Sequence, residues 1–392
     1  MSGPGNPPFG SSSWPILLGN AGNTGVASVA ASLGGATSWS VSLDAENERG
    51  GYRIVVGEDG SLFVVWPSSL LALDPTGEIR WRRPRTGEGG LGTPMALADG
   101  SIILTEDGGR KLLSRDQATG NERWSIPGRW AFVTAFAVDA ILAQREPSSG
   151  NDAELHCLGA SGQLRWSYPL LGSFQGRTLV TSDRIVVAND GYLTALDFDG
   201  NFCWRANPRG FVAGDPRKLP PAADHERFWT EPMRLDERRI IIGYSHYDGH
   251  EFLIVDPVAK EVTTPDYFAH PSPPVIVTPG PEPRLVGHLS MRLRAFDTVG
   301  TLLFERRAPW EILNIVADSA GNLIVAEGVE PSYWSKYKDA YSLHDACGLV
   351  GFDAKGDLLF RWTAPGPMDA ALAIGRLGEI YCISEGRLWA VR

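Results

Sequence analysis

Short apolar stretches alternate with turns rich in Gly, Asp and Pro along most of this 392-residue chain. Stretches such as SIILTED (101–107) and RIVVAND (184–190) are almost continuously apolar. This pattern is typical of strands that are covered on both faces of a sheet. The 45 glycines, about 11% of the chain against an average near 7%, also favour short strands joined by turns. We therefore expect an all-β protein.

The stretches form a repeat: an apolar strand, then Asp, two or three residues, Gly, a few residues and a Trp or Phe. The consecutive aromatic positions Trp81, Trp124, Trp166 and Trp204 are 43, 42 and 38 residues apart. The copies are LLALDPTGEIRW (70–81), LLSRDQATGNERW (112–124), LHCLGASGQLRW (155–166), LTALDFDGNFCW (193–204), LRAFDTVGTLLF (293–304), LVGFDAKGDLLF (349–360) and a degenerate FLIVDPVAKEVTT (252–264).

Each part of the unit has a physical role. The Asp side chain can accept hydrogen bonds from the amides of the turn it begins, and the Gly supplies a positive φ. The terminal aromatic offers a large flat surface for packing between neighbouring sheets. Four strands fit into one period, for example 172–182, 184–190, 192–197 and 201–206. Four-stranded units repeated around an axis make a β-propeller.

The two ends of the chain predict how the ring closes. The last unit, EIYCISEGRLWAVR, stops at Arg392 one strand short, while GGATSWSVSL (34–43) holds Trp39 without preceding strands of its own. We expect this N-terminal strand to complete the last blade. The repeat units then predict eight blades, with seven as the alternative if the unit around Asp256 does not form a full blade. Residues 1–13 are expected to be a flexible tail, and 14–392 a single propeller domain.

The repeat ALDxxGxxxW, with WPILLGNAGNTG (14–25) ahead of it, resembles the pyrroloquinoline-quinone-like propeller repeat. That superfamily includes quinoprotein alcohol dehydrogenases and an outer-membrane assembly lipoprotein with an eight-bladed ring. The resemblance covers residues 14–392 and implies the fold rather than a function, because one scaffold hosts unrelated activities. The chain lacks the adjacent cysteine pair common beside the quinone, and its first cysteine is Cys157. Neither a quinone cofactor nor a lipid anchor is therefore expected.

Composition narrows the classes of partner. The formal net charge of −10 and a pI near 5.3 argue against nucleic acid, and no apolar run is long enough to cross a bilayer. The opening residues lack the basic start and apolar stretch of a secretory signal, so a cytoplasmic protein is expected, with no membrane partner. The cysteines form no CxxC, and Cys157, Cys203 and Cys382 are interpreted as reduced thiols in apolar strands.

Three segments depart from the period: 207–227, 244–252 and 329–348. The first joins an outermost strand to the next innermost one, and the other two join second and third strands. In an up-and-down blade these two kinds of connection emerge on the same face. We therefore expect all three segments at one end of the ring, over blades five to seven, where loops on a rigid frame can carry function.

Six of the seven histidines are expected on the same face of the ring as these three segments. Histidine is the commonest metal ligand and the usual acid–base group near neutral pH. The candidate catalytic residues are His225, His246, His250, His344 and Asp345, and the candidate metal ligands are His246, Asp248 and His250. The alternative is a standard Asp248-Gly249 hairpin turn flanked by solvated histidines.

Aromatic side chains accompany these histidines. Tyr333, Tyr337 and Tyr341 are spaced as on one face of a short helix, which predicts either a ligand-stacking wall or a helix that fills the channel mouth. The candidate ligand-binding residues are Trp229, His270, His288, Tyr333, Trp334 and Tyr337.

Two classes of function stay open. One is a binding module that holds a peptide, a protein or a small molecule on the face over blades five to seven. The other is an enzyme, either a hydrolase, a lyase or an isomerase, with a His/Asp site at the channel mouth and a divalent metal as a candidate cofactor.

Overall fold

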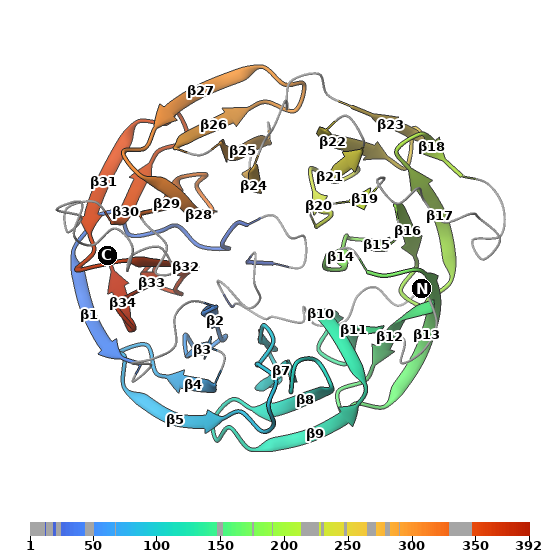
Figure 1. Cartoon of the computed structure of the whole chain (residues 1–392), viewed down its shortest axis with the longest axis horizontal. Helices are drawn as coiled ribbons and strands as arrows, with labels where there is room; N and C mark the ends of the chain where they lie inside the picture. The colour runs from blue at the N-terminus through green and yellow to red at the C-terminus, as the bar shows by residue number, and fades with distance from the viewer. Residues whose placement is uncertain are drawn as a thin grey trace.

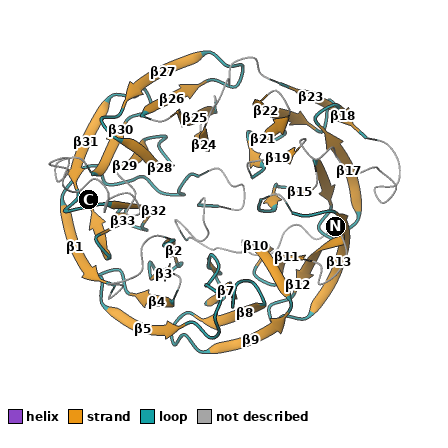
Figure 2. Ribbon diagram, in the orientation of Figure 1, coloured by secondary structure: helices purple, strands orange, loops and turns teal. Residues whose placement is uncertain are grey.

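The computed structural model describes residues 12, 19–20, 25–43, 51–66, 68–146, 152–174, 176–189, 191–212, 227–228, 231–246, 249–264, 272–278, 283–289, 291–328 and 347–392. Every regular element among these residues is a β-strand, and the strands form eight antiparallel sheets arranged around a central axis (Figures 1 and 2). Within the same residues, no helix is long and apolar enough to span a membrane.

Blades 1 to 4 follow one another around the ring in chain order. Blade 1 contains β2 (Arg53–Val56), β3 (Leu62–Trp66), β4 (Ser69–Leu73) and β5 (Ile79–Pro84). Blade 2 contains β6 (Met95–Ala96), β7 (Ser101–Glu106), β8 (Lys111–Asp116) and β9 (Glu122–Pro127). Blade 3 contains β10 (Arg129–Ala137), β11 (Ala140–Glu146), β12 (Asp152–Leu158) and β13 (Leu164–Leu171). Blade 4 contains β14 (Leu179–Val180), β15 (Ile185–Asn189), β16 (Tyr192–Leu196), β17 (Phe202–Asn207) and the added edge strand β18 (Gly210–Phe211).

Blades 5 to 8 complete the circle. In blade 5, β19 (Arg227–Phe228) and β20 (Met233–Arg234) both pair with β21 (Ile240–His246), which is followed by β22 (Gly249–Asp256) and β23 (Glu261–Thr263). Blade 6 contains β24 (Ser272–Thr278), β25 (Arg284–Leu289), β26 (Arg292–Phe296) and β27 (Leu302–Arg307). Blade 7 contains β28 (Glu311–Ala317), β29 (Leu323–Gly328), β30 (Gly348–Phe352) and β31 (Leu358–Thr363). Blade 8 contains β32 (Met368–Ile374), β33 (Ile380–Ser384), β34 (Arg387–Val391) and β1 (Thr37–Ser42).

The ring closes as the sequence predicts. β1 pairs with β34, with Ser40 opposite Trp389 and Val41 opposite Leu388, so an N-terminal strand is the outermost strand of the last blade. The unit around Asp256 does form a blade, which confirms eight blades rather than seven.

The order of strands defines two faces. We call "turn face" the one that carries the connections from first to second and from third to fourth strands. The "insertion face" carries the connections from second to third strands and from blade to blade. The core lies between blades: Val186 and Ala188 of blade 4, for example, belong to one buried cluster with Ile240 and Leu253 of blade 5.

The segment before β1 is anchored on the turn face. The Ala27 amide donates to the Ala317 carbonyl at 2.8 Å, and the Ala31 amide donates to an Asp318 carboxylate oxygen at 2.9 Å. Farther along, the Ser32 amide donates to the Gly378 carbonyl at 2.7 Å. Figure 1 shows this blue segment crossing from the middle of the ring to β1. It therefore ties blades 7 and 8 together before the ring closes.

The Asp turns have the predicted geometry. Asp74 accepts hydrogen bonds from the amides of Thr76 at 2.8 Å and Glu78 at 2.9 Å, and Gly77 has a φ of 90°. The indole of Trp39, on the preceding blade, lies so close to Gly77 that an added Cβ would be 2.7 Å from the ring. Only glycine leaves room for this approach.

The same contact joins most neighbouring blades, and we call it the aromatic–glycine contact. Its ring comes from the fourth strand of one blade, and its glycine precedes the fourth strand of the next, in the third-to-fourth turn except in blade 8, where Gly35 lies just before β1. The pairs are Trp39–Gly77, Trp81–Gly120, Trp124–Gly162, Trp166–Gly200, Phe304–Gly356 and Phe360–Gly35. Three indoles also donate to the carbonyl that follows the first residue of that turn: Trp81 to Gln117 at 2.9 Å, Trp124 to Ala160 at 2.7 Å and Trp166 to Phe198 at 3.2 Å.

Candidate functional site

Blade 5 departs from the aromatic–glycine contact at both of its junctions. Blade 4 offers Trp204, but the turn of blade 5 holds Lys260, at a φ of 57°, where other turns hold glycine. Trp204 packs instead against Phe211 of β18, with ring centroids 5.4 Å apart. Blade 6 offers Gly300, at a φ of 97°, but β23 of blade 5 has Thr263 at the aromatic position.

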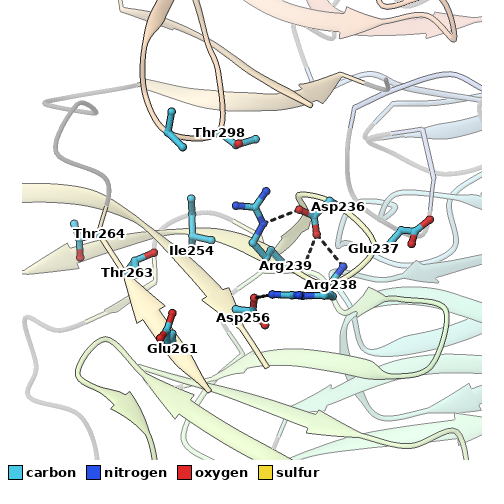
Figure 3. A pocket seen from close by; sticks show the side chains of 11 residues that line it. Asp236, Glu237, Arg238, Arg239, Ile254, Asp256, Glu261, Thr263, Thr264 and Thr298 are labelled. Carbon is cyan, nitrogen blue, oxygen red and sulfur yellow. Dashed lines mark hydrogen bonds and ion pairs between the residues drawn. The ribbon is translucent and has the colours of Figure 1, made fainter. Parts of the chain in front are cut away.

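A groove lies on the turn face at each of these junctions. The groove between blades 5 and 6 has a volume of about 770 Å³, and its walls include Ile254, Thr263 and Thr298. The groove between blades 4 and 5 has a volume of about 450 Å³ and includes Trp204. Both grooves share the turn 236–239, so a single turn of blade 5 separates them. Figure 3 shows Thr298 across the first groove from Ile254 and from this turn.

Hydrogen bonds fix the shared turn. The Asp236 carboxylate accepts from the amides of Arg238 at 2.8 Å and Arg239 at 2.7 Å, and from the Arg239 guanidinium at 2.6 Å. Burial by itself would raise the pKa of Asp236, but these hydrogen bonds outweigh it and hold that pKa below its ordinary value. Arg238 pairs with Asp256, whose carboxylate also accepts the amides of Val258 and Ala259, both at 2.9 Å (Figure 3).

The larger groove is polar and acidic. Its walls carry four carboxylates and two guanidinium groups, a net charge of −2: Asp236, Glu237, Asp256 and Glu261 against Arg238 and Arg239. Apolar surface is present as well, since Val299 at one edge is 77% exposed. Because Asp236 and Asp256 are already held by arginines and backbone amides, they form fixed walls rather than acid–base groups. The arrangement suits binding of a polar segment more than proton transfer.

The predicted site residues on the insertion face fall largely outside the described residues. These are His225, Trp229, Asp248, His270, Tyr333, Trp334, Tyr337, His344 and Asp345. The backbone of His246 and His250 is described in the β21–β22 hairpin, where His246 is opposite Gly249 and Ser245 is opposite His250. His288 lies on β25 and is half-buried. The catalytic, ligand-binding and metal roles of all these residues stay predictions.

The strands that flank the irregular segments run in the expected order. β29 and β30 are the second and third strands of blade 7, and β21 and β22 are those of blade 5. Nearly all of the residues that connect them lie outside the described residues, so the position of the inserted segments stays a prediction. Among the residues that the structure describes, no group of three or more His, Cys, Asp or Glu side chains is placed to hold a metal ion.

A buried ion pair stands near the axis at the inner ends of blades 3 to 5. Arg177 is 2% exposed, its Nε lies 3.2 Å from a Glu231 carboxylate oxygen, and its guanidinium lies over the Phe132 ring at 5.4 Å. The Gln144 side chain donates to the Gly176 carbonyl at 2.9 Å, which ties blade 3 to the same segment. These contacts join three blades to one another.

The four cysteines are free. Cys157 and Cys382 are buried in strands, and burial raises the pKa of the Cys157 thiol to about 12. Such a thiol is protonated at neutral pH and is not an activated nucleophile.

Sequence reasoning concentrated on the insertion face and missed the turn-face grooves. Their signal is nevertheless present in FLIVDPVAKEVTT (252–264), which has neither the glycine nor the aromatic residue of the other copies. A unit that lacks both parts cannot complete the contact on either side.

Comparison with known proteins agrees with the fold. The model of the family described as outer membrane protein assembly factor BamB matches residues 23–131 and 128–216, so the match ends before blade 5. No curated protein matches the chain in sequence.

Solved structures extend the likeness to most of the ring. BamB from Moraxella catarrhalis is 15% identical with a TM-score of 0.57, covering 91% of this chain and 99% of that one. The Dos1 propeller is 9% identical with a TM-score of 0.60, covering 91% and 94%. Apo AztD from Citrobacter koseri is 12% identical with a TM-score of 0.52, covering 81% and 87%. At these identities the likeness shows the fold alone.

Proposed function

We propose that this chain, which belongs to the pyrroloquinoline-quinone-like β-propeller repeat superfamily, is a binding module that holds a peptide or protein segment across blade 5. The observation that carries this proposal is that both junctions of blade 5 lack the aromatic–glycine contact, and that the groove at one of them, at about 770 Å³, is larger than the groove of about 520 Å³ at an intact junction. A scaffold alone has no need of such a gap, whereas loops and gaps on a rigid ring are common places for ligands.

The shape and chemistry of the grooves favour a polypeptide over a small apolar ligand. Two grooves of about 770 and 450 Å³ lie on either side of the turn 236–239, so that an extended segment can contact both. Their walls are mostly charged and hydroxyl-bearing, with Val258 and Val299 as exposed apolar points. The net charge of −2 in the larger groove favours a segment that carries Lys or Arg.

The relatives support a protein partner in general terms. The matching family is described as an outer membrane protein assembly factor, a description in which the factor acts on another protein. That description is carried to this chain only as support for the class of ligand.

The function can be tested with a matched pair of variants. Peptides are selected from a phage-displayed random library on the intact protein, and their dissociation constants are measured by fluorescence anisotropy. Val299→Lys adds a cation at the edge of the larger groove, two residues after the turn Asp. Ala118→Lys makes the same change at the corresponding position of blade 2, which lines a groove of about 520 Å³ at a junction with an intact contact. We expect loss of affinity in the first variant only. Equal affinities in both variants would contradict the proposal.

A second function on the insertion face is favoured by one described feature, the β21–β22 hairpin that carries His246 and His250 at its end. We propose His246, Asp248 and His250 as ligands of a divalent metal, with His225, His344 and Asp345 as acid–base groups of a hydrolase, lyase or isomerase. Elemental analysis of protein purified without a tag or chelator tests this function. One bound metal per chain that is lost in the His246→Ala, His250→Ala variant supports it, and metal-free wild-type protein contradicts the metal site.

A further inference from the structure

The third-to-fourth turn of blade 6 has the same hydrogen bonds as turns whose glycine contacts an aromatic ring. Asp297 accepts from the amides of Val299 at 3.0 Å and Thr301 at 2.7 Å. In blade 7, Asp353 accepts from Lys355 and Asp357, both at 2.8 Å, and Gly356 of that turn lies under Phe304. Gly300 corresponds to Gly356 and also has a positive φ, 97° against 82°.

The strand that should supply the ring does not do so. Thr263 pairs with Ile254 on β22, as Trp124 of blade 2 pairs with Ser114. A threonine side chain is too short to cover a glycine on the neighbouring blade as an indole does. The groove between blades 5 and 6 is lined by Thr263, at the aromatic position of β23, and by Thr298 and Val299 of the turn that carries Gly300.

The groove also contains the residue that would orient an indole. In the turns of blades 2, 3 and 4, the second residue accepts a hydrogen bond at its carbonyl from the indole N–H of the preceding blade. These acceptors are Gln117, Ala160 and Phe198. The corresponding residue of blade 6 is Thr298, which lies across the groove from Ile254 (Figure 3). A carbonyl oxygen has two lone pairs and can accept a second donor.

We propose that this groove is a seat for an aromatic side chain of a bound partner, tryptophan above all, whose ring covers Gly300 and whose N–H points to the Thr298 carbonyl. This inference rests on the proposed binding function and names the chemistry of its ligand. The partner's ring completes the contact that β23 leaves incomplete. Glu237 and Glu261, both exposed on the walls, favour Lys or Arg beside that ring, so the occupant is a basic segment with a central tryptophan.

A tryptophan introduced into β23 should occupy this groove and exclude the partner's ring. Thr263→Trp places an indole where Trp124 and Trp166 stand in their blades, and Thr363→Trp adds the same side chain at the exposed end of β31 as a control. The probe is the blocked peptide Lys-Lys-Trp-Lys-Lys carrying 5-fluorotryptophan, followed by ¹⁹F NMR, with Lys-Lys-Phe-Lys-Lys and Lys-Lys-Ala-Lys-Lys as competitors. We expect binding to wild type and to Thr363→Trp, at least about a tenfold weaker affinity for Thr263→Trp, and no competition by the alanine peptide.

Several outcomes would overturn the inference. Equal affinity of the probe for wild type and Thr263→Trp would do so, and so would full competition by the alanine peptide. If Thr263→Trp does not fold, Val299→Lys replaces it, and unchanged affinity of the probe for that variant also counts against the seat. Tyr267 and Phe268 follow β23 in the sequence and lie outside the described residues. A fall in stability on Tyr267→Ala, Phe268→Ala that matches the fall on Trp166→Ala would also overturn the inference, because the chain itself would then supply the ring.

The same experiments separate the inference from the proposed function. Library peptides that lack an aromatic residue but lose affinity in Val299→Lys would leave the binding module standing and overturn the aromatic seat. Failure of every library peptide and of the probe to bind the grooves would overturn both.

Discussion

The aromatic–glycine contact makes a quantitative prediction at Gly200. This residue has a φ of 84°, and an added Cβ would lie 2.7 Å from the indole of Trp166. An L-residue in the left-handed region costs about 1–2 kcal/mol. Overpacking against a fixed ring adds about 1–3 kcal/mol, because a contact below 3.0 Å forces the indole to move. Gly200→Ala should therefore lower the free energy of unfolding by about 2–5 kcal/mol.

Gly386 provides the control. It has a φ of 65°, and a Cβ added there meets nothing within 4 Å. Gly386→Ala should therefore cost only the backbone strain, about 1–2 kcal/mol. The difference between the two variants isolates the contact with the ring. Gly300→Ala, at a φ of 97°, should behave like Gly386→Ala, because β23 places no ring over it.

Guanidinium chloride titrations of the three variants, followed by circular dichroism, measure these differences through their midpoints. The expected order of midpoints places Gly386→Ala and Gly300→Ala together, with Gly200→Ala lower. Equal midpoints for Gly200→Ala and Gly386→Ala would refute the claim that the close contact limits the residue to glycine. A Gly300→Ala midpoint as low as that of Gly200→Ala would show that a ring already covers Gly300.

Three other predictions concern the rest of the ring. Removal of residues 1–43 deletes β1 and should lower the melting temperature, since β34 loses its partner; an unchanged melting temperature would contradict the closure of the ring. Cys157, with a pKa raised by burial to about 12, should react with iodoacetamide at pH 8 roughly a thousandfold more slowly in the native protein than in denaturant, and mass spectrometry can compare the two rates. The folded pKa of Asp236 is lowered despite its burial, so its stabilising effect should be complete above the ordinary Asp pKa of about 3.9 and should disappear as the pH falls through the folded value. Asp236→Asn should therefore be less stable than wild type at pH 7 and equally stable in acid. A difference in stability that does not change with pH would refute this.

Much of the fold could be predicted because its signals are local. Asp74, Gly77 and Trp81 lie within one short segment, and each acts on its own turn or on the adjacent blade. Repetition of that segment gives the number of blades. The first strand of blade 4 shows where local reasoning fails. We expected a strand over 172–182, but β14 covers only Leu179–Val180. Gly172 and Gly176 have positive φ values of 71° and 87°, which interrupt the extended backbone.

The candidate site was less accessible from the sequence. A groove between blades depends on two units at once, so the lack of an aromatic residue at Thr263 matters only because Gly300 belongs to the next blade. The pair of Arg177 and Glu231 likewise joins two blades, since Arg177 lies just before β14 and Glu231 lies between β19 and β20, and no spacing within the repeat indicates it. The predicted position of the histidines on the insertion face depends only on the order in which the strands are connected.

The central claim is that the incomplete junction between blades 5 and 6 is a binding seat for a basic segment with an aromatic residue. The most direct measurement is the affinity of the Lys-Lys-Trp-Lys-Lys probe for wild type and for Thr263→Trp, determined side by side by ¹⁹F NMR. The account predicts a loss of at least about tenfold, equivalent to about 1.4 kcal/mol, when the chain supplies its own indole. Equal affinities for the two proteins would contradict it.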